Sequence, residues 1–403
     1  MIQVSSGHNK GKITLNNSTK KDNSVSDSEP PPSPASIPSE GPNDKNGPFH
    51  FFPLDEATAP LQTITPELEA QKQIAADKNR PLEDRLEAYE DIFESEVGDT
   101  NLTRARNIER EVGLRQIYLK FEGGNPTGTQ KDRIAFTQVL DALRRGFDAM
   151  TMATCGNYGT AMALAASFAG LDCFIYIPDK YHTKRAQEME NHGAQIRFIK
   201  GDYEEAVKLS RDFAEKNEVY DANPGGANTA IQLKAYGEIA YEIYDELREA
   251  PAAVACPVSN GTTLAGIYKG YISLFRRGKI SRLPRLIAGS SFGKNPIVNA
   301  FVKNIPHCDD LQPEKIRETT INEPLINWQS IDGDHTLLAI RETDGYAAYA
   351  SDKNMLTYSK FIREREGLNV LPASTAGLIA LLERHRKTPF PNDRYVAILT
   401  GRR

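Results

Sequence analysis

Lys131 follows a turn that is unusual for a surface lysine. The stretch KFEGGNPTGTQKDRIA, residues 120–135, places three glycines and a proline ahead of Lys131, which is expected to lie in the first turn of a helix. The helix dipole disfavours a cation there by about 0.3–1 kcal/mol. It thereby favours the neutral amine that attacks carbonyl groups. The alternative is a surface lysine that pairs with Asp132 or Glu122.

A second turn lies in TMATCGNYGTAMA, residues 151–163, where a strand is expected to end at Thr154 and a helix to follow. Backbone N–H groups at such a start bind anions such as a carboxylate. Asn157 is suited to contact an aromatic hydroxyl, but Asn is also among the best N-cap residues, so capping stays an alternative. Cys155 has no obvious base beside it in the sequence. We expect it to be a small packing residue and not a nucleophile.

A third turn, ACPVSNGTTLAG at residues 255–266, has the composition of a phosphate cradle. Glycine permits close backbone approach, and hydroxyl and amide groups supply donors. It is not a P-loop, because no GK[ST] follows. The alternative is an ordinary strand-to-helix loop with a threonine cap. The residues concerned are Ser259, Asn260, Gly261, Thr262 and Thr263.

A fourth turn follows the strand in RYVAILTGRR, which is expected to end at Leu399 before Thr400 and Gly401. The plain interpretation is a sheet strand with a polar end. Upstream, Ser374 and Thr375 precede an apolar helix, where helix capping is the expected role.

The segments that carry these turns alternate between apolar strands and amphipathic helices. This alternation predicts an α/β fold with parallel sheets covered on both faces. In such folds ligands collect at the carboxyl ends of the strands, which is where the turns lie. The expected strands are 114–121, 149–154, 173–178, 194–199, 218–223, 252–258 and 285–290, and the expected helices are 131–147, 157–170, 183–193, 203–217, 231–248 and 262–278.

Composition excludes several classes of partner. With a net charge of −5 over 403 residues, neither nucleic acid nor an anionic membrane is favoured, and no apolar run approaches membrane-spanning length. The four cysteines lack the spacing of a zinc site, so no metal is expected, and so few thiols suggest a reducing, cytoplasmic location. Residues 1–65 are rich in Ser and Pro and are expected to form a disordered tail.

Taken together and in this order, the four turns resemble those of fold type II pyridoxal-phosphate enzymes, the tryptophan synthase β superfamily. GNPTGTQKDRIA is similar to the lysine motif, TCGNYGTA to the asparagine loop and PVSNGTTLAG to the phosphate loop. The resemblance covers about residues 96–401. The nearest branch resembles threonine synthase, because NPTG precedes the lysine and residues 321–381 carry NW, AIRETDG, SD and PAS in the expected order.

The resemblance implies a catalytic domain over residues 66–403, made of two three-layer αβα subdomains with mostly parallel sheets. The small subdomain would comprise 141–225 and the large one 85–140 plus 226–403, with pyridoxal 5'-phosphate in the cleft between them. It also implies a homodimer that acts on a small amino acid.

Each turn receives a role from the same resemblance. Lys131 would hold the cofactor as a Schiff base and move protons at the substrate Cα. Asn157 would contact the ring hydroxyl, and Thr400 would face the pyridine nitrogen. The phosphate would lie on Ser259, Asn260, Gly261, Thr262 and Thr263, and the substrate carboxylate on Thr154, Cys155, Gly156 and Tyr158.

The implied reaction is γ-elimination and hydration of O-phosphohomoserine to threonine. Thr129 and Gln130 depart from the serine and phenylalanine that usually precede the lysine. Residues 221–243 lack the basic GQKT-type element of threonine synthases and are similar to the NP…Y…GEI segment of cysteine synthases. The alternative is therefore β-elimination or β-replacement on a serine-, phosphoserine- or threonine-like substrate, as in cysteine synthases or dehydratases. A catalytically silent homologue is a third class, against which the retention of Lys131 argues.

Overall fold

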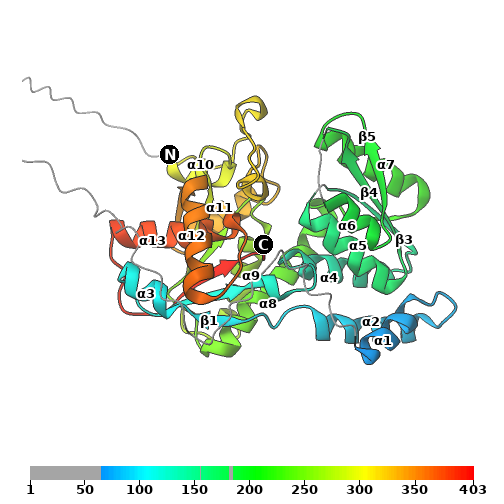
Figure 1. The fold of residues 1–403 in the computed structure, drawn as a ribbon, viewed down its shortest axis with the longest axis horizontal. Coiled ribbons are helices and arrows are strands. Elements are labelled where there is room, and N and C mark those ends of the chain that lie inside the picture. The colour runs from blue at the N-terminus through cyan, green and yellow to red at the C-terminus, as the bar shows by residue number, and fades with distance from the viewer. Residues whose placement is uncertain (1–64, 155, 181–184) are drawn as a thin grey trace, which may run out of the picture. The chain divides into compact units, whose positions relative to one another are not determined.

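The structure is a computed structural model that describes residues 65–154, 156–180 and 185–403 (Figure 1). The predicted tail lies outside the described residues, apart from Thr65. Within the described part of the chain, no helix is long and apolar enough to cross a membrane.

The elements alternate along the chain as the sequence predicts. The helices are α1 Pro66–Ala76, α2 Leu82–Glu96, α3 Arg106–Val112, α4 Lys131–Arg144, α5 Asn157–Ala169, α6 Arg185–Asn191, α7 Tyr203–Asn217, α8 Thr229–Leu247, α9 Thr262–Arg276, α10 Pro296–Val302, α11 Gly333–Glu342, α12 Asp352–Glu366 and α13 Ala376–Lys387. The strands are β1 Leu102–Arg104, β2 Ile117–Phe121, β3 Ala149–Ala153, β4 Asp172–Pro178, β5 Gln195–Ile199, β6 Tyr220–Asp221, β7 Ala253–Pro257, β8 Arg285–Ser291, β9 Tyr346–Ala350 and β10 Tyr395–Leu399.

One sheet has the strand order β1-β2-β10-β7-β8-β9. Its neighbouring strands from β2 to β9 run parallel, and β1 pairs with β2 in the antiparallel sense. The late strand β10 is therefore inserted between β2 and β7. As a result, the segments that follow β2, β10 and β7 leave from the carboxyl ends of three adjacent strands. These segments are three of the four turns singled out in the sequence.

The second sheet has the order β5-β4-β3-β6, and all of its pairs are parallel. The chain leaves β3 for β4 on one side, and β6 joins β3 on the other. Ligands in open α/β sheets bind where the strand order reverses in this way. The remaining turn, the second in chain order, follows β3 and begins at that position.

Both sheets are covered by helices on both faces, which confirms the predicted α/β class (Figure 1). In the first sheet, Val254 and Ile398 pack in a core shared with α8 and α9, whereas Ala255 and Leu399 pack against α13 on the opposite face. In the second sheet, α7 covers one face and α5 the other. Apolar side chains on both faces of a strand explain why the sequence reads as continuous apolar runs.

Two predicted strands are shorter than expected. Residues 114–121 contribute only β2, Ile117–Phe121, which begins after Gln116 adopts φ 57°. Residues 218–223 contribute only β6, because Glu218 adopts φ 53° at the end of α7. Beyond β6, the side-chain oxygen of Asn223 accepts a hydrogen bond from the Ala153 N–H at 2.9 Å. A side chain therefore replaces the backbone partner that a longer strand would supply.

Candidate active site

The turn before Lys131 is held by its own side chains. Gly128 adopts φ 83°, a conformation that favours glycine. Asp132 is buried and accepts hydrogen bonds from the Thr127 N–H at 3.0 Å and the Thr127 hydroxyl at 2.8 Å. Burial raises the pKa of Asp132 to about 7, while the bonds from Thr127 act in the opposite direction. The turn thus presents Lys131 as the first residue of α4.

Lys131 is half-buried as a residue, and within the described residues its amine makes no hydrogen bond or ion pair. Its Nζ lies 5.9 Å from the centre of the Tyr158 ring. Burial lowers the pKa of Lys131 to about 8, and the charge of Asp332 opposes that change. The neutral fraction of the amine near neutral pH is therefore larger than that of an ordinary lysine, and the neutral amine is the form that acts as a nucleophile.

The surface-lysine alternative is wrong. Asp132 binds Thr127, and Glu122 accepts hydrogen bonds from Arg133 at 2.6 and 3.0 Å. Arg133 also donates to Glu242 on α8, at 2.6 and 2.9 Å. This buried ion cluster ties the lysine turn to α8 and leaves neither carboxylate for Lys131.

The predicted phosphate loop connects β7 to α9. Gly261 is the N-cap of α9, with φ 90°, and no side chain caps the helix, so the threonine-cap alternative is wrong. A Cβ atom at position 261 would lie 2.3 Å from Thr336 Oγ1. Backbone N–H groups at the start of this helix are available to an anion. The backbone cradle therefore fits the cofactor phosphate that the resemblance implies.

Neighbouring segments hold the rest of the phosphate loop. Asn260 Oδ1 accepts a hydrogen bond from Asn327 Nδ2 at 2.5 Å, and the Ser259 carbonyl accepts one from the Ser330 hydroxyl at 3.1 Å. Thr262 and Thr263 are each 9% exposed. The side chain of Asn260 thus supports the loop, and its binding to phosphate stays a prediction.

The loop after β3 is described except for Cys155, which lies outside the described residues. Gly156, and not Asn157, is the N-cap of α5, so the capping alternative for Asn157 is wrong. The Asn157 amide has no hydrogen-bond partner in the described part of the chain, so it is available to a ligand. Thr154 Oγ1 accepts a hydrogen bond from the Gly156 N–H at 3.4 Å.

Tyr158 presents its ring, and not its hydroxyl, to Lys131. The hydroxyl is buried and bonded to Gln138 Oε1 at 2.6 Å and to the Ala222 carbonyl at 2.7 Å. Burial raises the pKa of Tyr158 well above its ordinary value. Any contact of Tyr158 with a substrate carboxylate would therefore involve its backbone.

Thr400 lies directly after β10, and its hydroxyl is 3.2 Å from the Ser374 hydroxyl. Ser374 also lies 3.3 Å from the Gly401 carbonyl. Thr375 occupies the N-cap of α13 as predicted, but its side chain makes no capping bond. Ser374 lies in the 3-10 turn Pro372–Thr375 before the helix, so its predicted capping role is wrong. Ser374 instead supports the residue predicted to face the pyridine nitrogen, a role that its sequence context did not indicate.

The sequence analysis also missed Asp332, which is 2% exposed. Its carboxylate accepts a hydrogen bond from the Thr262 hydroxyl at 2.5 Å. No local motif marks it, because the contact joins two segments that are distant in the chain. Elsewhere in the described residues, no group of three or more His, Cys, Asp or Glu side chains is placed to hold a metal ion.

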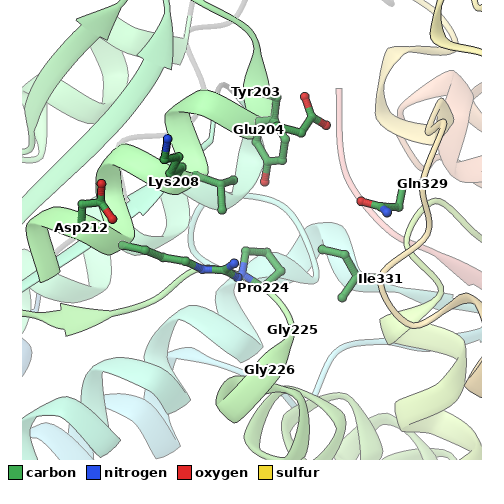
Figure 2. A pocket seen from close by; sticks show the side chains of 11 residues that line it. Tyr203, Glu204, Lys208, Asp212, Pro224, Gly225, Gly226, Gln329 and Ile331 are labelled. Carbon is green, nitrogen blue, oxygen red and sulfur yellow. The ribbon is translucent and has the colours of Figure 1, made fainter. Parts of the chain in front are cut away.

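A pocket of about 460 Å³ lies beside these loops, between α7, residues 224–226 and residues 329–331. Figure 2 shows Lys208 and Asp212 on one side and Gln329 and Ile331 facing them. The Ile331 N–H lies 3.5 Å from Asn260 Oδ1, in the phosphate loop. The pocket thus adjoins the predicted cofactor site.

Comparisons with known proteins identify the family. Residues 93–401 match the family described as "Pyridoxal-phosphate dependent enzyme". Threonine synthase from Methanocaldococcus jannaschii is 30% identical over 307 residues, 75% of this chain and 74% of that protein. Threonine synthase from Mycobacterium bovis is 31% identical over 291 residues, 71% of this chain and 76% of that protein.

Solved structures share the fold. The processed form of threonine deaminase isoform 2 from Solanum lycopersicum has a TM-score of 0.65 at 16% identity, covering 79% of this chain and 90% of that one. Maize serine racemase has a TM-score of 0.62 at 18% identity, and the match covers 79% of this chain and 93% of that one.

Proposed function

Because this chain belongs to the family of pyridoxal-phosphate-dependent enzymes, we propose that it is a lyase that converts O-phosphohomoserine to threonine, as a threonine synthase does. The observation that carries the proposal is the Lys131 amine. It begins α4, has no hydrogen-bond or ion-pair partner in the described residues, and has a pKa lowered to about 8 by burial. The choice of substrate is supported by 30% identity to a curated threonine synthase over three quarters of both chains.

The proposed reaction balances with one water consumed and one phosphate released. The bond between Cγ and the phosphate oxygen breaks, and the oxygen of water adds to Cβ. Bound pyridoxal phosphate supplies the electron sink for negative charge at Cα. The neutral Lys131 amine takes the proton from Cα and later returns a proton to the substrate carbons.

The remaining loops are proposed to bind and orient. Residues 259–263 hold the cofactor phosphate, and the Asn157 amide contacts the ring hydroxyl. The Thr400 hydroxyl faces the pyridine nitrogen. Because a neutral hydroxyl does not enforce a protonated ring, it weakens the sink, which suits elimination better than transamination. Thr154 and its neighbours in the loop after β3 receive the substrate carboxylate.

A specific observation supports a second candidate function, β-elimination or β-replacement on a serine-like substrate. The pocket beside the cofactor loops is lined by Lys208 and Arg211 but also by Glu204 and Asp212, so its formal charges cancel. The adjoining segment Pro224–Gly226 brings no cation. A pocket of balanced charge does not by itself select a phosphate-bearing substrate.

Absorbance tests the role of Lys131. Protein reconstituted with pyridoxal phosphate is expected to show a band at about 410–420 nm from the covalently held cofactor. The band is expected to vanish in Lys131→Ala and to persist in Lys279→Ala, which removes an exposed lysine. A wild-type protein without this band would contradict the enzyme proposal.

A substrate panel tests the reaction. O-phosphohomoserine, O-phosphoserine, O-acetylserine and threonine are compared by release of phosphate, acetate, pyruvate or 2-oxobutyrate. Threonine and phosphate formed in equal amounts from O-phosphohomoserine would support the first candidate. Turnover of a β-substituted serine, with none of phosphohomoserine, would replace it by the second.

We also propose that the protein is a cytoplasmic homodimer. The low cysteine content supports the location, and the dimers common in the fold type II superfamily support the oligomeric state. Light scattering of the purified chain tests the dimer, since a monomer and a dimer differ twofold in mass. Fractionation of the source cells tests the location.

A further inference from the structure

Asp332 is a buried carboxylate that points at the predicted phosphate loop. It is the N-cap residue of α11, yet its side chain makes no capping bond to that helix. Its Oδ2 accepts the Thr262 hydroxyl proton at 2.5 Å, and its backbone N–H donates to the Asn260 carbonyl at 3.0 Å. The side chain is thus committed to the loop between β7 and α9, and not to its own helix.

The segment around Asp332 is fastened to the same loop at further points. The Thr336 hydroxyl donates to the Gly261 carbonyl at 2.9 Å, and the Ser330 hydroxyl donates to the Ser259 carbonyl at 3.1 Å. These bonds flank Asp332 on both sides in the sequence. The carboxylate therefore has little freedom to move away when an anion enters the cradle.

Two consequences for an anion follow from this placement. A hydroxyl has one proton, and the Thr262 proton is given to Asp332, so it is not available to a phosphate oxygen. In addition, a carboxylate beside an anion site repels the anion, and the repulsion is stronger in a partly buried site than in water. The backbone of the cradle attracts phosphate, while this one side chain opposes it.

In the described part of the chain, two basic side chains interact with Asp332. His335 Nδ1 lies 3.8 Å from Asp332 Oδ1, but the imidazole is 66% exposed. Lys131 interacts with Asp332 electrostatically. The carboxylate therefore acts on Lys131 and on the phosphate loop together.

We propose that Asp332 is a positioning residue that lowers the affinity of this chain for pyridoxal phosphate. It does so by accepting the hydrogen bond of the Thr262 hydroxyl and by placing a fixed negative charge beside the phosphate cradle. The cofactor phosphate is then bound by backbone N–H groups, and the cofactor dissociates more readily than it would from the same cradle without Asp332. The inference rests on the family's cofactor and not on which amino acid is the substrate.

The test uses full-length protein in which the covalent bond to the cofactor cannot form. Lys131→Ala and Lys131→Ala/Asp332→Asn are titrated with pyridoxal phosphate, with pyridoxal, which lacks the phosphate, and with inorganic phosphate as a competitor. The Asp332→Asn change is expected to lower the dissociation constants of pyridoxal phosphate and of inorganic phosphate about tenfold, because one unit charge is removed from beside the cradle. Pyridoxal is expected to bind equally to both proteins.

Thr262→Val in the Lys131→Ala background provides the second measurement. If the hydroxyl serves Asp332, its loss changes the affinity for pyridoxal phosphate less than about threefold, whereas loss of a phosphate donor would cost about tenfold or more. Unchanged or weaker phosphate binding in the Asp332→Asn protein would overturn the proposal. The proposal would also be overturned if Asp332→Asn raised the affinity for pyridoxal as much as the affinity for pyridoxal phosphate. A tenfold loss of affinity for pyridoxal phosphate in Thr262→Val would overturn it as well. Thermal unfolding of each protein confirms that the compared variants are folded.

Discussion

The backbone N–H of Gln130 donates a hydrogen bond to the carbonyl oxygen of Thr400 at 3.0 Å. Beside it, Thr129 and Gly401 form an isolated antiparallel bridge, and the Arg402 N–H donates to the Gly128 carbonyl at 2.9 Å. These bonds join the turn before Lys131 to the segment that follows β10. The placement of the lysine therefore depends on residues far away in the chain.

Arg402→Ala is expected to loosen the lysine turn. The Arg402 guanidinium donates to the Gly123 carbonyl at 3.2 Å and to the Pro126 carbonyl at 3.1 Å. Losing these half-exposed bonds is expected to lower the free energy of unfolding by about 1–2 kcal/mol and to weaken cofactor binding severalfold. Urea unfolding and cofactor titration measure the two effects. Arg403→Ala is the control, because Arg403 is exposed and contacts Asn369 through its backbone; an equal loss there would contradict the assignment.

Arg133→Ala is expected to destabilise the protein strongly. The change leaves the fully buried carboxylate of Glu122 without its cation, whereas the partly buried Glu242 keeps Lys120, and breaking a buried pair costs about 3–5 kcal/mol. Arg144→Ala is the matched control on the same helix, since its ion pair with Glu90 is exposed and is worth about 1 kcal/mol or less. Denaturant unfolding of the cofactor-free proteins compares them. Equal decreases in the free energy of unfolding of Arg133→Ala and Arg144→Ala would show that the buried ion cluster does not stabilise the lysine turn.

The pKa of Lys131 predicts how cofactor attachment depends on pH. The rate of covalent attachment to cofactor-free protein is expected to rise with pH up to about 8 and then level off, because the neutral amine is the reacting form. Stopped-flow absorbance at several pH values measures this. A rate that continues to rise to pH 10 would mean that burial does not lower the pKa.

The same pKa also affects stability. The folded-state value of about 8 lies below the ordinary value of 10.5, so folding releases a proton between these two pH values. The unfolded chain binds more protons in this window, and the contribution of Lys131 to stability therefore rises with pH from about 8 to 10.5. Lys131→Met is expected to remove this part of the pH dependence of unfolding.

The turns of the candidate site were predictable from sequence, but the way in which the fold brings them together was not. The turn at Gly261 could be identified because Gly and hydroxyl residues cluster between an apolar strand and a helix. The insertion of β10 between β2 and β7 depends on long-range strand pairing, for which the sequence carries no local signal. Asp332 was missed for the same reason. Tyr158 was assigned from its place in the loop, whereas burial of its hydroxyl depends on Gln138, which lies in a different helix.

Gly261→Ala is expected to abolish tight cofactor binding. The residue has φ 90°, and the added Cβ would lie 2.3 Å from Thr336 Oγ1, so the loop must shift. The strain is expected to cost about 1–3 kcal/mol. Gly278→Ala, just beyond the other end of α9, is the control, because it also has a positive φ, 65°, but no atom lies within 4 Å of the new Cβ. In fluorescence titrations, the Kd for pyridoxal phosphate is expected to rise at least tenfold in Gly261→Ala and to stay unchanged in Gly278→Ala.

Lys208→Glu is expected to distinguish the two candidate reactions. Lys208 lines the pocket beside the cofactor loops, and the formal charges of the pocket lining cancel when Lys208 is counted (Figure 2). If the phosphate of O-phosphohomoserine occupies this pocket, reversing the charge raises KM for that substrate by about tenfold or more, because repulsion replaces attraction. It leaves kcat and the cofactor absorbance close to wild type. Lys216→Glu makes the same charge change on the exposed end of α7, outside the pocket, and controls for the long-range effect of net charge. Equal KM values for Lys208→Glu and Lys216→Glu would show that the substrate phosphate binds elsewhere, whereas a KM effect confined to Lys208→Glu would place the phosphate in this pocket.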